Sequence, residues 1–175
     1  MTIEVLDESG DGVDLRGLSS LARFVLDRLR VHPLAELCIM AVDEPTMTEL
    51  NEQWMGSEGP TDVLAFPIDE LRPGLAGEEP EEGVLGDLVL CPTVAARQAE
   101  QAGHGFGAEI ELLTVHGILH LLGHDHAEPE EHRVMFGLQD DLLAQWRDGA
   151  DTDGTDTDGT DTDGTDTERT ETGPA

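Results

Sequence analysis

The chain has 175 residues and a mass of 18.9 kDa, a length that predicts one compact domain. Hydrophobic residues make up 38% of it, enough for a buried core, and two cysteines are too few for a disulfide framework. No stretch approaches the roughly 20 apolar residues that cross a bilayer, and no early apolar run has the form of a signal peptide. These features argue against a membrane-spanning or secreted protein and favour a cytoplasmic one.

The net charge is the strongest compositional feature. Thirty-nine acidic residues face nine basic residues, all of them Arg, which gives a formal net charge of −30. Ten of the acidic residues and one Arg lie from Asp148 onward, so residues 1–147 still carry a net charge of −21. A body this acidic repels bulk nucleic acid. Any nucleic-acid partner would therefore have to be held at a local site, by a bound metal or by a partner protein.

The predicted elements alternate between short strands and amphipathic helices. Apolar runs predict strands at 3–6, 37–42, 63–66 and 84–91. Apolar residues at helical spacing predict helices at 15–31, 46–54, 92–102, from about 108 through the histidine-rich region, and at 129–146. Trp54 is predicted to face inward, and residues 71–83, rich in Pro, Gly and Glu, are predicted to form a mobile acidic loop. The helix from about 108 is apolar almost all round, which predicts that it is buried.

The carboxyl-terminal stretch is of low complexity. Asp-Thr-Asp-Gly-Thr repeats at 151–155, 156–160 and 161–165. These repeats contain fragments of a calcium loop, but no Glu closes the frame and no helices are predicted on both sides. We therefore predict a single domain over residues 1–147 and a disordered acidic tail of Asp, Thr and Gly repeats over 148–175.

Four of the seven histidines fall between residues 116 and 126, which read His-Gly-Ile-Leu-His-Leu-Leu-Gly-His-Asp-His. His116 and His120 are four residues apart and so share one face of a helix, where both can bind one metal ion. Gly123 can adopt a left-handed conformation that ends the helix and lets His126 return as a third ligand. His124 is the alternative third ligand, and the spacing of the motif favours His126.

The spacing H-x3-H-x2-G-x2-H is that of the metzincin proteases, except at one position. Metzincins have Glu, their general base, directly after the first histidine, and here that residue is Gly117. Three neutral imidazoles leave one position of a tetrahedral Zn²⁺ open for water, as in catalytic zinc sites. The pattern predicts one zinc ion without the protease base. The alternative is that some of these histidines serve only packing.

Together with two other motifs, the histidine run resembles the YbeY family of bacterial rRNA maturation factors. The resemblance rests on residues 116–126, on Thr-Asp-Val-Leu-Ala-Phe-Pro at 61–67 and on Leu-Gly-Asp-Leu at 85–88, in family order within about residues 35–147. It implies an α+β fold, with a small mixed β-sheet packed with several helices and a metzincin-like zinc-binding helix. By the same resemblance, His116, His120 and His126 are the zinc ligands.

The implied function is that of a zinc-dependent endoribonuclease of the cytoplasm that cleaves single-stranded RNA. The resemblance also implies a part in maturing the 3′ end of 16S rRNA and in ribosome quality control, with ribosomal proteins or a ribosome-associated GTPase as partners. One position departs from the family pattern. Met55 stands where many members have an Arg taken to engage RNA.

Without a Glu after His116, a general base must come from elsewhere. Asp125, beside the third ligand, is the candidate, either as the base or as a residue that orients a ligand histidine; a turn-forming role is the alternative. Asp87 is a weaker candidate for the base. Two other functions remain open: a non-enzymatic ribosome assembly factor with a structural zinc, and a zinc metallopeptidase, against which the missing Glu argues.

Overall fold

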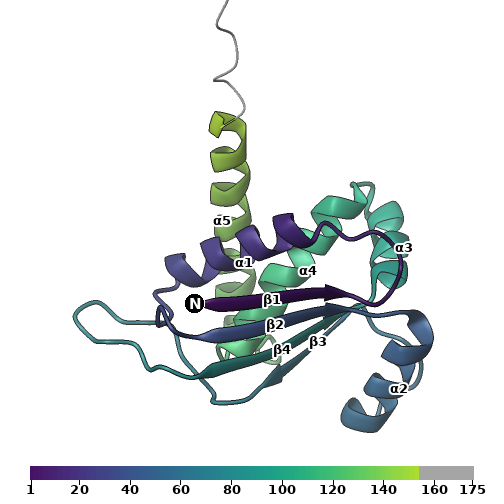
Figure 1. The fold of residues 1–175 in the computed structure, drawn as a ribbon, viewed down its shortest axis with the longest axis horizontal. Helices are drawn as coiled ribbons and strands as arrows, with labels where there is room; N and C mark the ends of the chain where they lie inside the picture. Colours follow the sequence, from purple (N-terminus) through teal and green to yellow (C-terminus); the bar gives the residue numbers. More distant parts are fainter. Residues whose placement is uncertain (154–175) are drawn as a thin grey trace, which may run out of the picture.

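A four-stranded sheet forms the centre of the structure, a computed structural model that describes residues 1–153 (Figure 1). The strand order across the sheet is β1 (Thr2–Asp7), β2 (Glu36–Ala41), β4 (Val84–Leu90) and β3 (Val63–Pro67). The first three in this order run parallel, and β3 pairs antiparallel with β4. The small mixed sheet and its helices confirm the predicted α+β fold.

Five helices surround this sheet (Figure 1). Helices α1 (Leu15–Arg28) and α4 (Phe106–Leu121) cover one face, with α3 (Pro92–Ala102) packed beside α4. Helix α5 (Pro129–Asp153) packs against α4 on the side away from the sheet, and α2 (Glu44–Met55) lies at one end of the opposite face. Helix α4 is thus enclosed by the sheet and by three other helices.

Local sequence signals explain where the first helices begin. The carboxylate of Asp14 accepts a hydrogen bond from the N–H of Gly17 at 3.0 Å, and α1 starts directly after it. Asp43 caps α2 in the same way, accepting from the N–H of Thr46 at 2.9 Å. Each cap satisfies a backbone N–H that has no partner within the helix and contributes about 1 kcal/mol.

The main core lies between the sheet and helices α1, α4 and α5. Helix α4 contributes Ile118, Leu119 and Leu121, each fully buried, as its apolar sequence predicts. Burial of one such side chain contributes about 1.5–3 kcal/mol. The helix that carries two of the candidate ligands is therefore firmly packed in the core, which fixes the positions from which the ligands project.

The opposite face of the sheet is only partly covered. A smaller apolar cluster lies under α2, and beside it is an open groove of about 500 Å³ lined by Cys38, Met40, Leu50, Trp54, Phe66, Asp87, Leu88 and Val89. Trp54 is 61% exposed, so the prediction that it faces inward is wrong. Its ring packs edge-on against that of Phe66, with the ring centroids 6.3 Å apart.

Several helix boundaries differ from the predicted ones. Helix α1 ends at Arg28 rather than at residue 31, and α2 spans Glu44–Met55 rather than 46–54. Helix α4 begins at Phe106 rather than near residue 108, because its N-cap is Gly105, inside the predicted break. Helix α5 continues from Pro129 to Asp153 rather than ending near residue 146, since each residue added to an existing helix gains a hydrogen bond. The predicted boundary between domain and tail thus falls within α5. The rest of the predicted tail, 154–175, lies outside the described residues.

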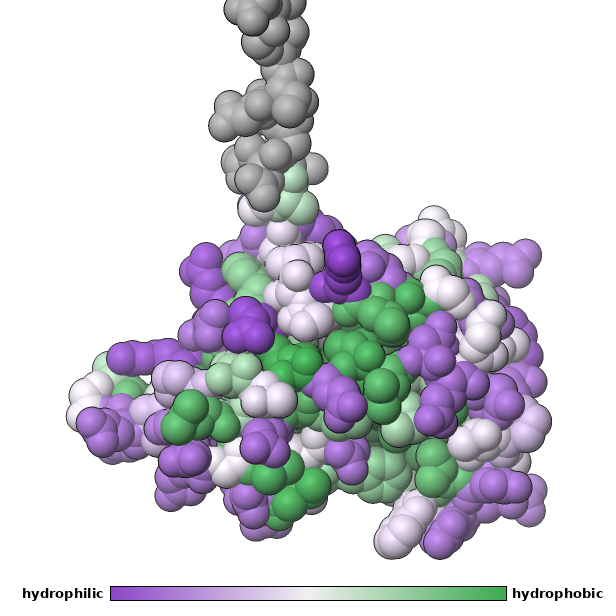
Figure 2. Space-filling view, in the orientation of Figure 1, coloured by the Kyte–Doolittle hydropathy of each residue, from purple (hydrophilic) through white to green (hydrophobic). Residues whose placement is uncertain are grey.

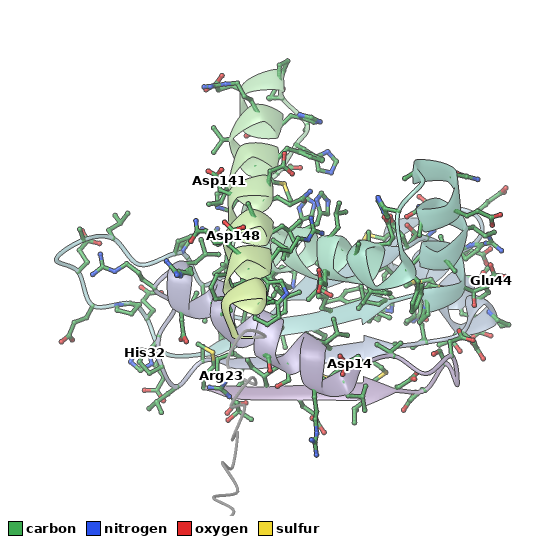
Figure 3. The ribbon with its side chains drawn as sticks, turned by 90° about the horizontal axis from the view of Figure 1, so that it is seen from above. Asp14, Arg23, His32, Glu44, Asp141 and Asp148 are labelled. Carbon is green, nitrogen blue, oxygen red and sulfur yellow. The ribbon has the colours of Figure 1, made fainter. Side chains whose placement is uncertain are left out.

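The surface of the described residues is mixed. Figure 2 shows apolar groups over the middle of one face with polar groups around them. Figure 3 labels four acidic residues. Asp14 lies at the start of α1, Glu44 at the start of α2, and Asp141 and Asp148 in α5. The negative charge is therefore not confined to one helix. Within residues 1–153, none of the helices has the length and apolar character needed to cross a bilayer.

Candidate metal centre

The chain reverses direction directly after α4. The N–H of Gly123 donates to the carbonyl of His120 at 3.0 Å, and the N–H of His124 donates to the carbonyl of Leu119 at 3.0 Å. This pair of bonds is a Schellman motif, which requires a left-handed residue after the helix. Gly123 has φ of +91°, a conformation that costs glycine little. The turn predicted at Gly123 is present, and it directs residues 124–126 back toward the end of α4.

The turn brings three imidazoles together. The ligand nitrogens of His116, His120 and His126 all lie within 4.8 Å of one another, whereas His124 is not part of the group. The Nε2 atoms of His116 and His120 are 3.1 Å apart. Two nitrogens bound to one tetrahedral zinc at 2.0–2.1 Å would be separated by about 3.3 Å. The spacing of the donor atoms therefore fits one shared metal ion.

Neighbouring groups act on the rings of the two helix histidines. Nδ1 of His116 lies 2.9 Å from Oε1 of Gln139, a residue of α5 that is 2% exposed. An amide oxygen can only accept, so Nδ1 carries the proton and Nε2 presents its lone pair to the cluster. The backbone of His124, at the turn itself, acts on the ring of His120 and opposes the fall in its pKa. The Gln139 contact holds the ring of His116 in the orientation that a metal needs.

The electrostatic environment favours neutral imidazoles. Burial lowers the pKa of His116 below its ordinary value, against the opposing effects of Gln139 and of the Asp62 charge. Burial and the neighbouring His116 also lower the pKa of His120. Neutral imidazole is the form that binds metal ions. His116 and His120 therefore remain neutral, and able to bind a metal ion, at a pH where a free histidine would already take up a proton.

Helix α5 supplies an aromatic wall beside the cluster. The ring of Phe136 lies 5.6 Å from that of His116 and 6.1 Å from that of His126, measured between centroids. The exposed His132 stacks on Phe136 at 4.1 Å with an interplanar angle of 14°. Sequence reasoning missed His132, Phe136 and Gln139. Their only signal in the sequence is their spacing. Phe136 follows His132 by four residues and Gln139 follows Phe136 by three, which places all three on one face of a helix.

The two candidate bases lie in different places. The exposed Asp125 accepts a hydrogen bond from the N–H of His126 at 2.7 Å, so it lies in the turn next to the third histidine. Asp87 and Leu88 are neighbours on β4, so their side chains point to opposite faces of the sheet. The side chain of Leu88 packs under Gly117 of α4. Asp87 instead lines the groove on the far side of the sheet, which separates it from the histidines.

The contact between α5 and His116 leads to a testable prediction. Replacing Gln139 by Leu removes the acceptor that holds Nδ1 of His116. Loss of such a partner typically lowers metal affinity 10- to 100-fold, and we expect a loss of about this size, measured by competition with a zinc chelator. Gln139→Glu retains an acceptor and should lose much less. Equal affinities in Gln139→Leu and the unaltered protein would contradict the orienting role.

Comparisons with known proteins place this geometry in a family. Residues 7–147 match the family model described as endoribonuclease YbeY. A protein named endoribonuclease YbeY from a Nocardioides species is 77% identical over 147 residues, which cover 84% of this chain and 99% of that protein. The protein of the same name from Thermobifida fusca is 62% identical over 147 residues, with coverage of 84% and 95%.

A solved structure shares the fold. The solution structure of TM1509 from Thermotoga maritima matches with a TM-score of 0.55 and 24% identity, covering 90% of this chain and 99% of that one. At this identity the likeness concerns the fold alone. The family model and the close relatives confirm the resemblance seen in the sequence motifs: the chain belongs to the YbeY family of endoribonucleases.

Proposed function

We propose that the protein is a zinc-dependent endoribonuclease that cleaves single-stranded RNA, with His116, His120 and His126 as the ligands of one Zn²⁺. The observation that carries the proposal is the convergence of three imidazole nitrogens on one point, in a chain whose relatives are named endoribonucleases. Three nitrogen ligands suit zinc and leave its fourth position for water or substrate, as in catalytic zinc sites. His126 is exposed, which leaves the cluster accessible to an RNA strand.

Zinc bound there would act as a Lewis acid on a phosphoryl oxygen and lower the pKa of a bound water to about 7. The residues of the chain do the rest. Burial keeps His116 and His120 in the neutral, metal-binding form, and Gln139 fixes the ring of His116. Asp125 lies next to the third ligand and is our candidate for the group that accepts a proton from the attacking water.

We further propose that the protein acts in the cytoplasm, in maturation of the 3′ end of 16S rRNA and in ribosome quality control. Membership of the family supports this role. The net charge of −21 over residues 1–147 disfavours unaided binding to long RNA, which supports partner proteins that hold the rRNA in place. Ribosomal proteins or a ribosome-associated GTPase are the partners we propose.

Cleavage of a labelled single-stranded RNA by the purified, zinc-loaded protein tests the function. We expect cleavage that stops when a chelator removes the metal and returns when zinc is added, with slower cleavage of the same sequence in a duplex. No cleavage by folded, zinc-bound protein would favour the non-enzymatic ribosome assembly factor with a structural zinc. Hydrolysis of peptides would favour the zinc metallopeptidase, against which Gly117 argues because it stands in place of the protease base.

The role of Asp125 has its own test. In Asp125→Asn the amide oxygen can still accept from the N–H of His126, but the group no longer takes up a proton. If Asp125 is the base, we expect the variant to keep its zinc and to lose about 10²–10⁴-fold in cleavage rate. Zinc content and single-turnover rates measure the two effects. Loss of zinc would instead show that Asp125 supports a ligand, and no change in either quantity would leave it a turn residue.

A further inference from the structure

One arginine lies against the metal-binding turn. Arg72 belongs to the loop between β3 and β4, and a Cβ atom built on Gly123 would lie 2.7 Å from its Cζ atom and 2.8 Å from Nη1. The guanidinium therefore rests on the backbone of Gly123, between the second and third candidate zinc ligands in the chain.

The backbone around Arg72 is anchored, although the sequence predicts a mobile loop there. Leu71 is 2% exposed and belongs to the main core, and the N–H of Gly74 donates to the carbonyl of Leu29 at 3.0 Å. Glu70 adopts φ of +50°, which is unfavourable for a residue other than glycine and persists only where the surroundings impose it. Nη1 of Arg72 donates to the carbonyls of Glu70 and Leu71, at 2.9 and 3.2 Å.

The charge of Arg72 is not neutralised by a carboxylate. Three other arginines form ion pairs: Arg97 with Glu44, Arg133 with Glu130 and Arg147 with Glu111. Within residues 1–153 the structure records no ion pair for Arg72, and both of its hydrogen bonds use Nη1 and backbone carbonyls. The Nε and Nη2 donors remain for another group.

We infer that Arg72 binds a phosphate of the RNA next to the scissile bond. This inference rests on the proposed function. Three neutral imidazoles leave Zn²⁺ with its two positive charges, so the ion and Arg72 together form a positive site on a body of charge −21. A guanidinium presents parallel N–H groups that match two phosphate oxygens. Arg72 thus supplies a local attraction beside the histidine cluster, on a surface that is acidic as a whole.

The test compares Arg72→Met with Arg16→Met in the zinc-loaded protein. Methionine keeps an unbranched stem over Gly123 but removes the charge. Arg16 is an exposed residue near the start of α1. This part of α1 lines a pocket together with the first turn of α4, whereas His120 lies at the other end of α4. Single-turnover cleavage of a short labelled RNA gives the half-saturating protein concentration and the maximal rate. Both are measured at salt concentrations from about 50 to 200 mM.

We expect Arg72→Met to raise the half-saturating concentration about tenfold at the lowest salt. When the logarithm of the half-saturating concentration is plotted against the logarithm of the salt concentration, the slope should fall by about 0.7. This is the value for one phosphate contact on a single strand. Arg72→Lys should restore the slope, because it restores the charge. Zinc content and thermal stability should not change. If Arg72→Met does not fold, Arg72→Gln serves instead, since its amide can still donate to the Glu70 or Leu71 carbonyl.

Two outcomes would overturn the inference. The first is an equal salt slope in Arg72→Met and Arg16→Met. The second is loss of zinc from Arg72→Met with its salt slope intact, which would make Arg72 a support for the turn. Failure of the proposed function gives a different result, because the unaltered protein would then not cleave the RNA at all. In that case, fluorescence anisotropy of the same RNA with the zinc-loaded proteins still decides whether Arg72 binds phosphate.

Discussion

The His120→Ala variant is expected to lose zinc and RNA cleavage together. His120 holds its Nε2 3.1 Å from that of His116, and its removal leaves two imidazoles, one of them on the exposed turn. A metal ion contributes several kcal/mol to a hydrolytic transition state, so the rate should fall by about 10³-fold or more. Zinc content by elemental analysis and single-turnover cleavage of a labelled single-stranded RNA measure the two losses.

A matched histidine provides the control. His32 follows α1 and forms a local hydrogen bond with the N–H of Leu34, so His32→Ala should keep both zinc and activity. Circular dichroism should show that His120→Ala remains folded, since His120 is only half-buried at the end of α4. Full cleavage by a folded His120→Ala protein that contains no zinc would refute a metal-dependent mechanism at this site.

The Gly117→Glu variant is expected to be strongly destabilised. A Cβ atom at Gly117 would lie 2.1 Å from Cδ1 of Leu88, because α4 packs directly on β4 at this position. The carboxylate that metzincins carry after their first histidine would thus enter the core between helix and sheet. Overpacking and an unpaired buried charge together should reduce the free energy of unfolding by about 4 kcal/mol or more.

Chemical denaturation of three variants separates the causes. Gly117→Ala adds only the methyl group and should lose about 1–3 kcal/mol from overpacking, partly offset by the better helix propensity of Ala. Gly137 lies on the exposed face of α5, and a Cβ atom there would meet no other atom within 4 Å. Gly137→Glu should therefore be neutral or stabilising. A Gly117→Glu protein as stable as Gly137→Glu would show that α4 does not pack on β4 as described.

The clustering of the three histidines could be predicted from the sequence because its geometry is local. His116, His120 and His126 lie within eleven residues, and helix spacing plus one glycine turn determine how they meet. The strands and helices were predictable for the same reason, since their apolar periodicity is short in range. The prediction of which histidine returns after the turn rested on the spacing of the motif, and the structure brings His126 into the group.

The parts that sequence reasoning missed depend on contacts between distant segments. Gln139 is one of several glutamines in the chain, and only the packing of α5 on α4 brings it to His116. Trp54 has the spacing of a core residue, but nothing in its neighbourhood along the chain shows that the far face of the sheet is open there. Asp87 was a plausible base by sequence, and the pleat of β4 places it on the other face.

The position of Gln139 has a consequence for synthesis of the protein. Ribosomes make chains from the amino end, so His116, His120 and His126 are translated before the residue that orients the first of them. Until α5 has emerged and docked on α4, His116 lacks the acceptor for its Nδ1 proton, and the buried apolar side of α4 lacks part of its cover. We therefore expect a nascent chain that lacks α5 to hold the ring of His116 less firmly and to bind a metal ion more weakly than the finished domain.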